Sequence, residues 1–245
     1  MLAVRYRLLL QSENSARKVL MDLLLLFWDL IVNLDKHLAG ALQQYGLWVY
    51  PLLFLIVFCE TGLVVTPFLP GDSLLFIAGA LTAAGSGADQ FNLFMLDVLL
   101  IAAAVLGNTT NYWIGRYFGP RVFAWENSRF FNRRAFDKAH AFYERRGGIT
   151  IVITRFLPIL RTFAPFVAGV AQMTHARFQA YNVFGGALWV LSLTLAGYLF
   201  GNIPSVKSNL TLIILALIIV PGLPALVVAI RTWYEQRRAR LGGKA

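Results

Sequence analysis

The sequence predicts an all-α polytopic membrane protein built as one membrane domain, and three observations support this class. The 245 residues are 58% hydrophobic and 14% charged, whereas soluble domains are about 45–50% apolar and about 25% charged. Several apolar runs approach the roughly 20 residues that a helix needs to cross a bilayer. The basic residues gather in residues 116–146 and 231–244, beside apolar runs, which is typical of cytoplasmic loops.

The N-terminal part divides into an arm and a helix. Residues 1–19 carry basic residues without a signal-peptide cleavage site, so we expect a poorly ordered cytoplasmic arm. Leu20–Val32 is apolar except for Asp22 and Asp29, which lie two turns apart and share one helical face. This predicts an amphipathic helix at the membrane interface. Met21 is an alternative start to Met1.

Residues 20–230 form the predicted membrane domain. Its four full crossings are expected at Leu47–Val65, Leu93–Ile114, Phe178–Phe200 and Leu210–Ile230. The basic loop contains Phe136, His140 and Tyr143 at helical spacing, which predicts a second interfacial helix. Residues 231–245 form a basic cytoplasmic tail.

Two further segments, Thr66–Ala84 and Ile149–Thr174, are apolar but interrupted, and we expect each to be a re-entrant helical hairpin. Proline breaks helices, and the expected breaks are Pro67, Pro70, Gly71, Pro158 and Pro165. With the basic loop and tail in the cytoplasm, the loops that are poor in Lys and Arg lie outside. The first hairpin then enters from outside and the second from the cytoplasm, with both termini cytoplasmic.

An internal repeat relates these segments. Phe68-Leu69-Pro70 matches Phe156-Leu157-Pro158, Phe76-Ile77-Ala78-Gly79 matches Phe166-Val167-Ala168-Gly169, and the residues 115–119 match 197–201. The three matches occur in the same order, over about residues 47–119 and 149–201. Because the hairpins enter from opposite faces, we predict an inverted repeat, which is common in transporters.

The two interrupted segments, together with Glu60 near the end of the preceding crossing, carry four charges with complementary chemistry, which predicts a single site built from both segments. Arg155 and Arg161 stay charged and present a planar fork suited to phosphate or carboxylate, so we assign them to head-group binding. Glu60 and Asp72 can bind and release protons, so we assign them to proton coupling. Asn108 and Asn111 either line a cavity or bond between helices.

A structural salt-bridge network is the alternative to this functional interpretation. Isolated charges at the bilayer centre cost about 2.5–3.5 kcal/mol each, or roughly 10 kcal/mol for four. Apolar residues could hold the segments together at a lower free-energy cost, which favours the functional interpretation of these charges. The single Cys59 and three widely spaced histidines predict no metal site. No Ser-His-Asp pattern occurs either, so we expect no cofactor and no enzyme activity.

The chain resembles the DedA family of bacterial inner-membrane proteins. The resemblance covers Met21 to Arg231 and rests on these stretches: residues 58–62, Pro67–Leu75, Gly115-Arg116, Arg155–Thr162 and Ala168-Gly169. It implies that Glu60 and Asp72 are the family's essential acidic pair and that Arg155 and Arg161 are its essential arginines. Close relatives carry Asp where this chain has Asn108.

The resemblance implies transport that depends on the proton-motive force, with a lipid phosphate such as undecaprenyl phosphate moved across the inner membrane. A phospholipid flippase or scramblase, or a proton-coupled carrier of a small soluble ion, remains an alternative. Membrane lipids are the expected partners and the proton is the expected coupling ion. Nucleic acid is not expected, because the net charge of +10 is distributed to meet anionic lipids. Monomer and homodimer both stay open.

Overall fold

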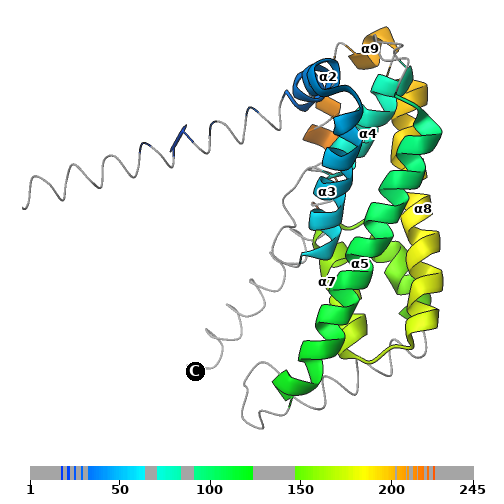
Figure 1. The fold of residues 1–245 in the computed structure, drawn as a ribbon. Helices are drawn as coiled ribbons and strands as arrows, with labels where there is room; N and C mark the ends of the chain where they lie inside the picture. The colour runs from blue at the N-terminus through cyan, green and yellow to red at the C-terminus, as the bar shows by residue number, and fades with distance from the viewer. Residues whose placement is uncertain are drawn as a thin grey trace, which may run out of the picture.

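The computed structural model describes residues 33–63, 71–83, 91–123 and 147–201, with single positions and short stretches elsewhere. Its helices are α2 (Leu34–Tyr45), η1 (Gly46–Trp48), α3 (Val49–Gly62), α4 (Gly71–Ala83), α5 (Leu93–Phe123), α7 (Pro158–Val170), α8 (His175–Phe200) and α9 (Pro204–Lys207). Residues 147–154 are helical as well. Within these ranges there is no strand, which confirms the predicted all-α class (Figure 1).

Three helical stretches are long and apolar enough to cross a membrane: Leu34–Gly62, Leu93–Phe118 and His175–Phe200. The first contains most of the predicted crossing at Leu47–Val65, and the last two correspond to the crossings predicted at Leu93–Ile114 and Phe178–Phe200. Most of the predicted crossing at Leu210–Ile230 lies outside the described residues. The same is true of the predicted interfacial helices, at Leu20–Val32 and around His140.

Helix α2 was not predicted. It is amphipathic, and it buries Leu34, Leu38 and Leu42 at a spacing of four residues, which places them on one face. The chain then turns at Gly46, whose φ of 53° lies in the left-handed region that glycine adopts readily. This turn lets α3 leave α2 in a new direction.

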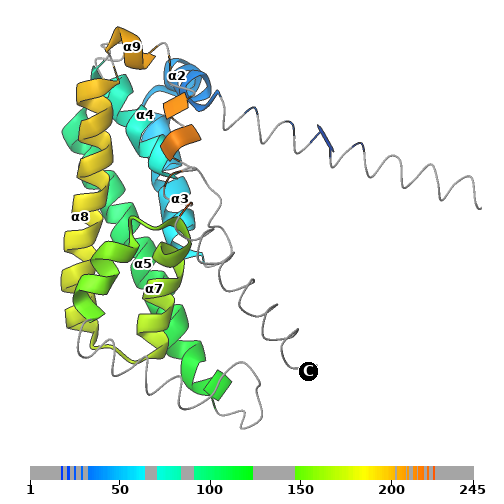
Figure 2. The ribbon, with the colours of Figure 1, turned by 180° about the vertical axis from the view of Figure 1, so that it is seen from behind.

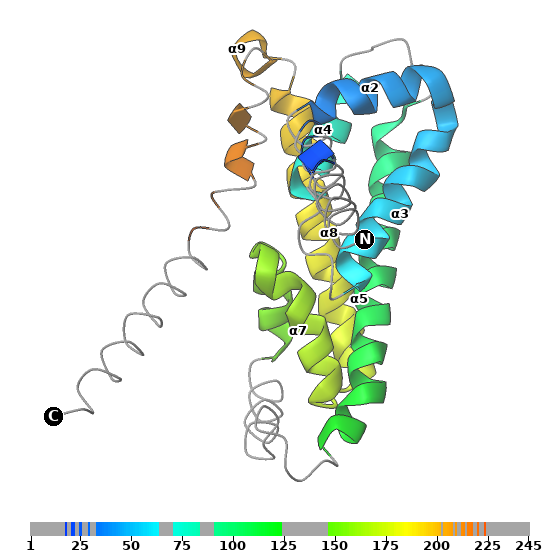
Figure 3. The same ribbon diagram turned by 90° about the vertical axis from the view of Figure 1, so that its left-hand side faces the viewer.

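Helices α3 and α4 form a pair that starts and finishes at the upper end of the bundle, where α5 begins (Figure 3). Near this end the backbone N–H of Asn92 donates to the Tyr50 hydroxyl, 2.8 Å away. Helix α3 runs beside α5 and ends where Gly62 packs on Gly107, near the middle of α5. Helix α4 begins against Glu60 and runs back until Ala80 contacts Gly201 beyond the end of α8.

This pairing differs from the hairpin predicted within Thr66–Ala84. Gly71–Ala83 is one unbroken helix, because Gly71 stands at its start and both prolines of the break precede it. The opposing arm is therefore α3. Pro67 and Pro70 themselves lie outside the described residues.

The second pair starts and finishes at the lower end. Residues 147–154 run along α8, with Gly148 against Tyr181 and Val152 against Gly185. The chain turns at residues 155–157, and α7 returns along α5. Pro158 opens α7 as predicted, at a position where a helix tolerates proline.

Pro165 was predicted as a break, and this is wrong. It lies inside α7, which continues to Val170. Proline removes the backbone hydrogen bond to the carbonyl four residues earlier, that of Arg161, yet it does not end this helix. Contacts with α5 hold α7 on both sides of Pro165, through Thr162 on Asn111 before it and Gly169 on Tyr112 after it, and they account for the continuity.

Each returning arm packs on a long helix from the other half of the sequence: α4 on α8, and α7 on α5 (Figure 2). Glycine allows both approaches, since an added Cβ would overlap a facing backbone carbonyl. The matched contacts are Gly79 on Thr194, Gly197 on Phe76, Gly169 on Tyr112 and Gly115 on Phe166. The motifs that match in sequence thus make matching contacts in the structure.

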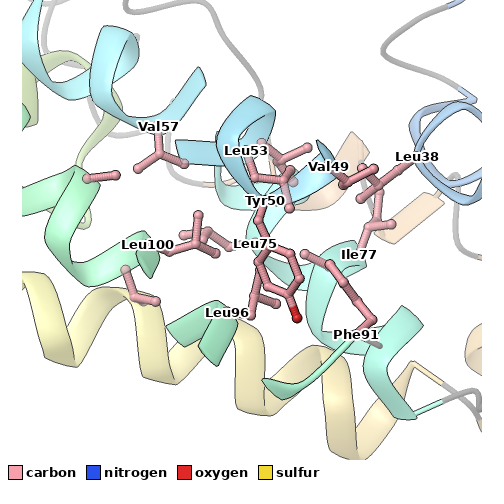
Figure 4. Packing of buried hydrophobic residues seen from close by; sticks show 14 of the residues in the cluster. Leu38, Val49, Tyr50, Leu53, Val57, Leu75, Ile77, Phe91, Leu96 and Leu100 are labelled. Atoms are coloured by element: carbon pink, nitrogen blue, oxygen red, sulfur yellow. The ribbon is translucent and has the colours of Figure 1, made fainter. Parts of the chain in front are cut away.

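The main apolar core lies in the upper half of the bundle. Side chains from α2, α3, α4 and α5 interlock there around Leu53, Leu75 and Leu100, each with at most 1% of its surface exposed (Figure 4). This core holds α3 on α5 and contacts α4, which packs on α8, and so it fixes where the inner ends of α3 and α4 lie.

The glycine contacts predict opposite effects for two alanine substitutions. Gly197→Ala should destabilise the protein by about 1–3 kcal/mol, because the new methyl group overlaps the Phe76 carbonyl. Gly40→Ala, in α2, meets nothing within 4 Å and should stabilise by about 0.5–1 kcal/mol. Thermal unfolding in detergent measures both, and equal effects would contradict the proposed close packing.

Candidate functional site

The inner ends of the two helix pairs meet at a buried ion cluster. Arg161, in the first turn of α7, donates from Nη1 to Oδ1 of Asp72 over 2.7 Å and from Nη2 to Oε1 of Glu60. The exposed fraction of the side chain is 4% for Arg161, 16% for Asp72 and 0% for Glu60. The structure therefore brings together three of the four charges that the sequence assigned to one site.

Local structure places the two carboxylates. Glu60 lies in the last turn of α3, and its carboxylate rests against Gly71, where any Cβ would overlap it. The backbone of Gly71 also donates a hydrogen bond to Glu60. Asp72 lies in the first turn of α4, where the helix dipole favours a negative charge. Gly71 thus begins α4 and also leaves the space in which the Glu60 carboxylate packs.

Trp189 completes the cluster, and it was missed from the sequence. Its Nε1–H donates to Oδ1 of Asp72 over 2.9 Å, and the Arg161 guanidinium lies 5.1 Å from the centre of its ring. The residue is 1% exposed. A buried indole N–H needs an acceptor, so a tryptophan in the middle of an apolar helix was the available signal.

Arg155 lies apart from the carboxylates. It is buried, and its Nη2 donates to the Asn182 side-chain oxygen over 2.5 Å and to the Asn182 carbonyl over 3.2 Å. In the amide orientation that satisfies its neighbours, Asn108 also accepts from Nη2, over 2.8 Å. Among the described residues, no carboxylate lies within salt-bridge distance of Arg155, and its Nε has no hydrogen-bond partner.

A seam of polar side chains between α5 and α8 supports Arg155. The Asn182 amide nitrogen lies within hydrogen-bond distance of Val105, Thr109 and Gln179, at 3.0–3.2 Å. Thr109 and Gln179 are half-buried, so the seam reaches from Arg155 to the surface. Asn182 was not predicted as a site residue, because one amide within a long apolar run looks like ordinary helix packing.

The two predicted asparagines take different roles. Asn108 contacts Arg155 and belongs to the site. Asn111 donates to the Thr162 carbonyl over 2.7 Å, and so it joins α5 to α7. Within the described ranges, no three His, Cys, Asp or Glu side chains converge as metal ligands would.

The two arginines are therefore chemically unequal. Arg161 is held by two acids, so its charge is more than balanced. Arg155 has only neutral partners in the described part of the chain. A buried cation without an anion is costly, and a planar guanidinium matches phosphate or carboxylate. Arg155 is thus the side chain best placed to receive an anion from outside the protein.

Comparison with known proteins gives one family and several relatives. The chain matches the VTT domain over residues 69–199. It is 54% identical to Protein DedA of Escherichia coli K12 over 211 residues, which cover 86% of this chain and 95% of that protein. An uncharacterized membrane protein of Mycobacterium tuberculosis H37Rv is 45% identical over 200 residues, covering 82% and 87%. Inner membrane protein YqjA of E. coli K12 is 37% identical over 155 residues, covering 63% and 69%. No solved structure matches the chain.

Proposed function

Because the chain belongs to the DedA family of VTT-domain membrane proteins, we propose that it is a transporter that flips a lipid phosphate such as undecaprenyl phosphate, driven by the proton-motive force. The observation that carries this proposal is Arg155, a buried cation with neutral partners beside a cluster in which acids hold Arg161. A phosphate head group would supply the missing negative charge, while the lipid tail stays in the bilayer.

In the proposed membrane arrangement, α5 and α8 cross fully and the two helix pairs are re-entrant. Helix α3 has 14 residues, or about 21 Å at the α-helical rise, which is short of the roughly 30 Å of hydrocarbon. The basic region, residues 116–146, begins in the last turns of α5 and continues beyond its lower end, so this end faces the cytoplasm. The α3–α4 pair then enters from outside and the α7 pair from the cytoplasm, as an inverted repeat.

This arrangement has a consequence for the N-terminus. Helix α2 lies at the upper end, beside α3 and α4 (Figure 1), which is the outer face in this orientation. The predicted cytoplasmic arm, residues 1–19, and most of Leu20–Val32 lie outside the described residues.

In the proposed coupling, two acids and the substrate phosphate compete for the guanidinium of Arg161. While Glu60 and Asp72 are ionised, they hold its guanidinium through two charge-assisted hydrogen bonds. Protonation of either acid weakens that hold and frees Arg161 to join Arg155 on the phosphate. Loss of the proton returns Arg161 to the acids and releases the anion. Proton and lipid movement are linked through this exchange.

The decisive experiment is a flux assay in vesicles that contain the purified protein and undecaprenyl phosphate. We expect movement of the lipid phosphate between leaflets to depend on the protein and to accelerate when a pH gradient is imposed. Equal rates with and without the gradient would contradict proton coupling. Uptake of soluble inorganic phosphate would instead favour the carrier of a small soluble ion. Movement of a phospholipid without net charge at the same rate as the lipid phosphate would favour the scramblase.

A further inference from the structure

Asp97 is a buried acid that the mechanism above does not use. It lies in the second turn of α5 and is 7% exposed. No Lys or Arg in the described part of the chain forms a salt bridge with it, and its Oδ1 has no hydrogen-bond partner. An ionised carboxylate in this position would be an unpaired charge at membrane depth, and such groups mark ion or proton pathways.

The partner of Asp97 is the hydroxyl of Thr194, on α8, to which it is hydrogen-bonded. The same hydroxyl lies 2.9 Å from the Val190 carbonyl, to which it donates. A hydroxyl has one proton to donate. When that proton goes to Val190, Thr194 can only accept from Asp97, and Asp97 must then be protonated. When Asp97 is ionised, the hydroxyl must turn towards it and leave Val190.

We propose that Asp97 binds and releases a proton, with Thr194 as the hydroxyl that follows its protonation state, between the ion cluster and the outer face. This proposal rests on the proposed proton-coupled transport. Thr194 lies five residues beyond Trp189 on α8, which is about 7–8 Å along the helix. Since Trp189 holds Asp72, Asp97 is displaced from the cluster towards the upper end of the bundle.

The surroundings of Asp97 favour a proton over a metal cation. The titratable or charged side chains on the helices packed around it are Tyr50, Cys59 and Glu60 of α3, Asp72 of α4, and His175, Arg177, Tyr181 and Tyr198 of α8. Helices α3 and α4 contribute no cation, and His175 and Arg177 lie at the opposite end of α8. Hard metal cations take about six oxygen ligands, whereas the described surroundings offer Asp97 one hydroxyl.

Infrared difference spectroscopy of the full-length protein in vesicles tests this site without relying on transport. Between acid and alkaline pH, the wild type should show the carbonyl stretching band of a protonated carboxyl group that is absent in Asp97→Asn. Thr194→Val should shift the frequency of that band, because it loses its hydrogen-bond partner. Asp35→Asn, on α2, is the matched control and should leave the band unchanged.

Identical difference spectra for the wild type and Asp97→Asn would overturn the proposal, as would a band that responds to sodium and not to pH. The flux assay separates this inference from the proposed function. If the band is present but no lipid phosphate moves, the proton site stands and the lipid substrate is wrong. If both hold, Asp97→Asn should keep lipid-phosphate binding and lose the acceleration by the pH gradient.

Discussion

Arg161→Ala is expected to destabilise the protein by about 3–5 kcal/mol, the range found when one partner of a buried ion pair is removed. The substitution leaves the fully buried Glu60 and the largely buried Asp72 facing each other with no cation between them. It also removes the contact that joins α7 to α3 and α4 at their inner ends. Thermal unfolding in detergent measures the loss of stability, and the vesicle assay should show no flux.

Two further variants test whether the effect of Arg161→Ala is specific to the ion cluster. Arg177→Ala removes an exposed arginine of α8, and we expect a change within about 0.5 kcal/mol. The double reversal Asp72→Arg with Arg161→Asp tests whether the cluster is only structural. If the reversed pair restored both stability and flux, the cluster would be a scaffold, and its assigned role in coupling would be wrong.

Arg155→Gln is expected to separate binding from folding. Glutamine can still donate to Asn182, and the substitution removes a buried charge that has no acidic partner among the described residues, so stability should stay the same or rise. Binding of undecaprenyl phosphate should weaken roughly ten- to a hundred-fold, because a hydrogen bond to a charged group contributes about 1.5–3 kcal/mol. Lipid titration of the purified protein measures this change.

The contrast between the two arginine variants is the control. A loss of stability in Arg155→Gln as large as that in Arg161→Ala would show that Arg155 is structural, with a counter-ion within the protein. Unchanged affinity for undecaprenyl phosphate would exclude Arg155 from the head-group site.

Complementary charges in the sequence predicted a single site, and Glu60, Asp72 and Arg161 meet there in the structure. The sequence did not predict that Arg155 would bind amides instead of acids. That difference depends on Asn182, whose position opposite Val105 and Thr109 is fixed by how α5 and α8 pack. Such a contact joins residues more than 70 positions apart, and no local pattern encodes it.

The boundaries of the first hairpin show a second limit of sequence reasoning. Hydropathy marks Leu47–Val65 as apolar and about long enough to cross, but it does not reveal that the helix ends at Gly62. That end is fixed by the contact between Gly62 and Gly107 and by the seat of Glu60 on Gly71. Pro165 shows the opposite case, since a residue that usually ends a helix is tolerated where tertiary packing holds both sides.

Helix α4 of the first half packs on α8 of the second half, and this affects how the protein folds during its synthesis. Asp72 and Trp189 are separated by 117 residues, so α4 leaves the ribosome long before the helix it packs on. At roughly 5–20 residues per second this interval lasts roughly 6–23 s. Arg161 follows Asp72 by 89 residues, so for most of that time the acids of the first half have neither partner beside them. The nascent first half therefore waits, incompletely folded, for the second half to close it.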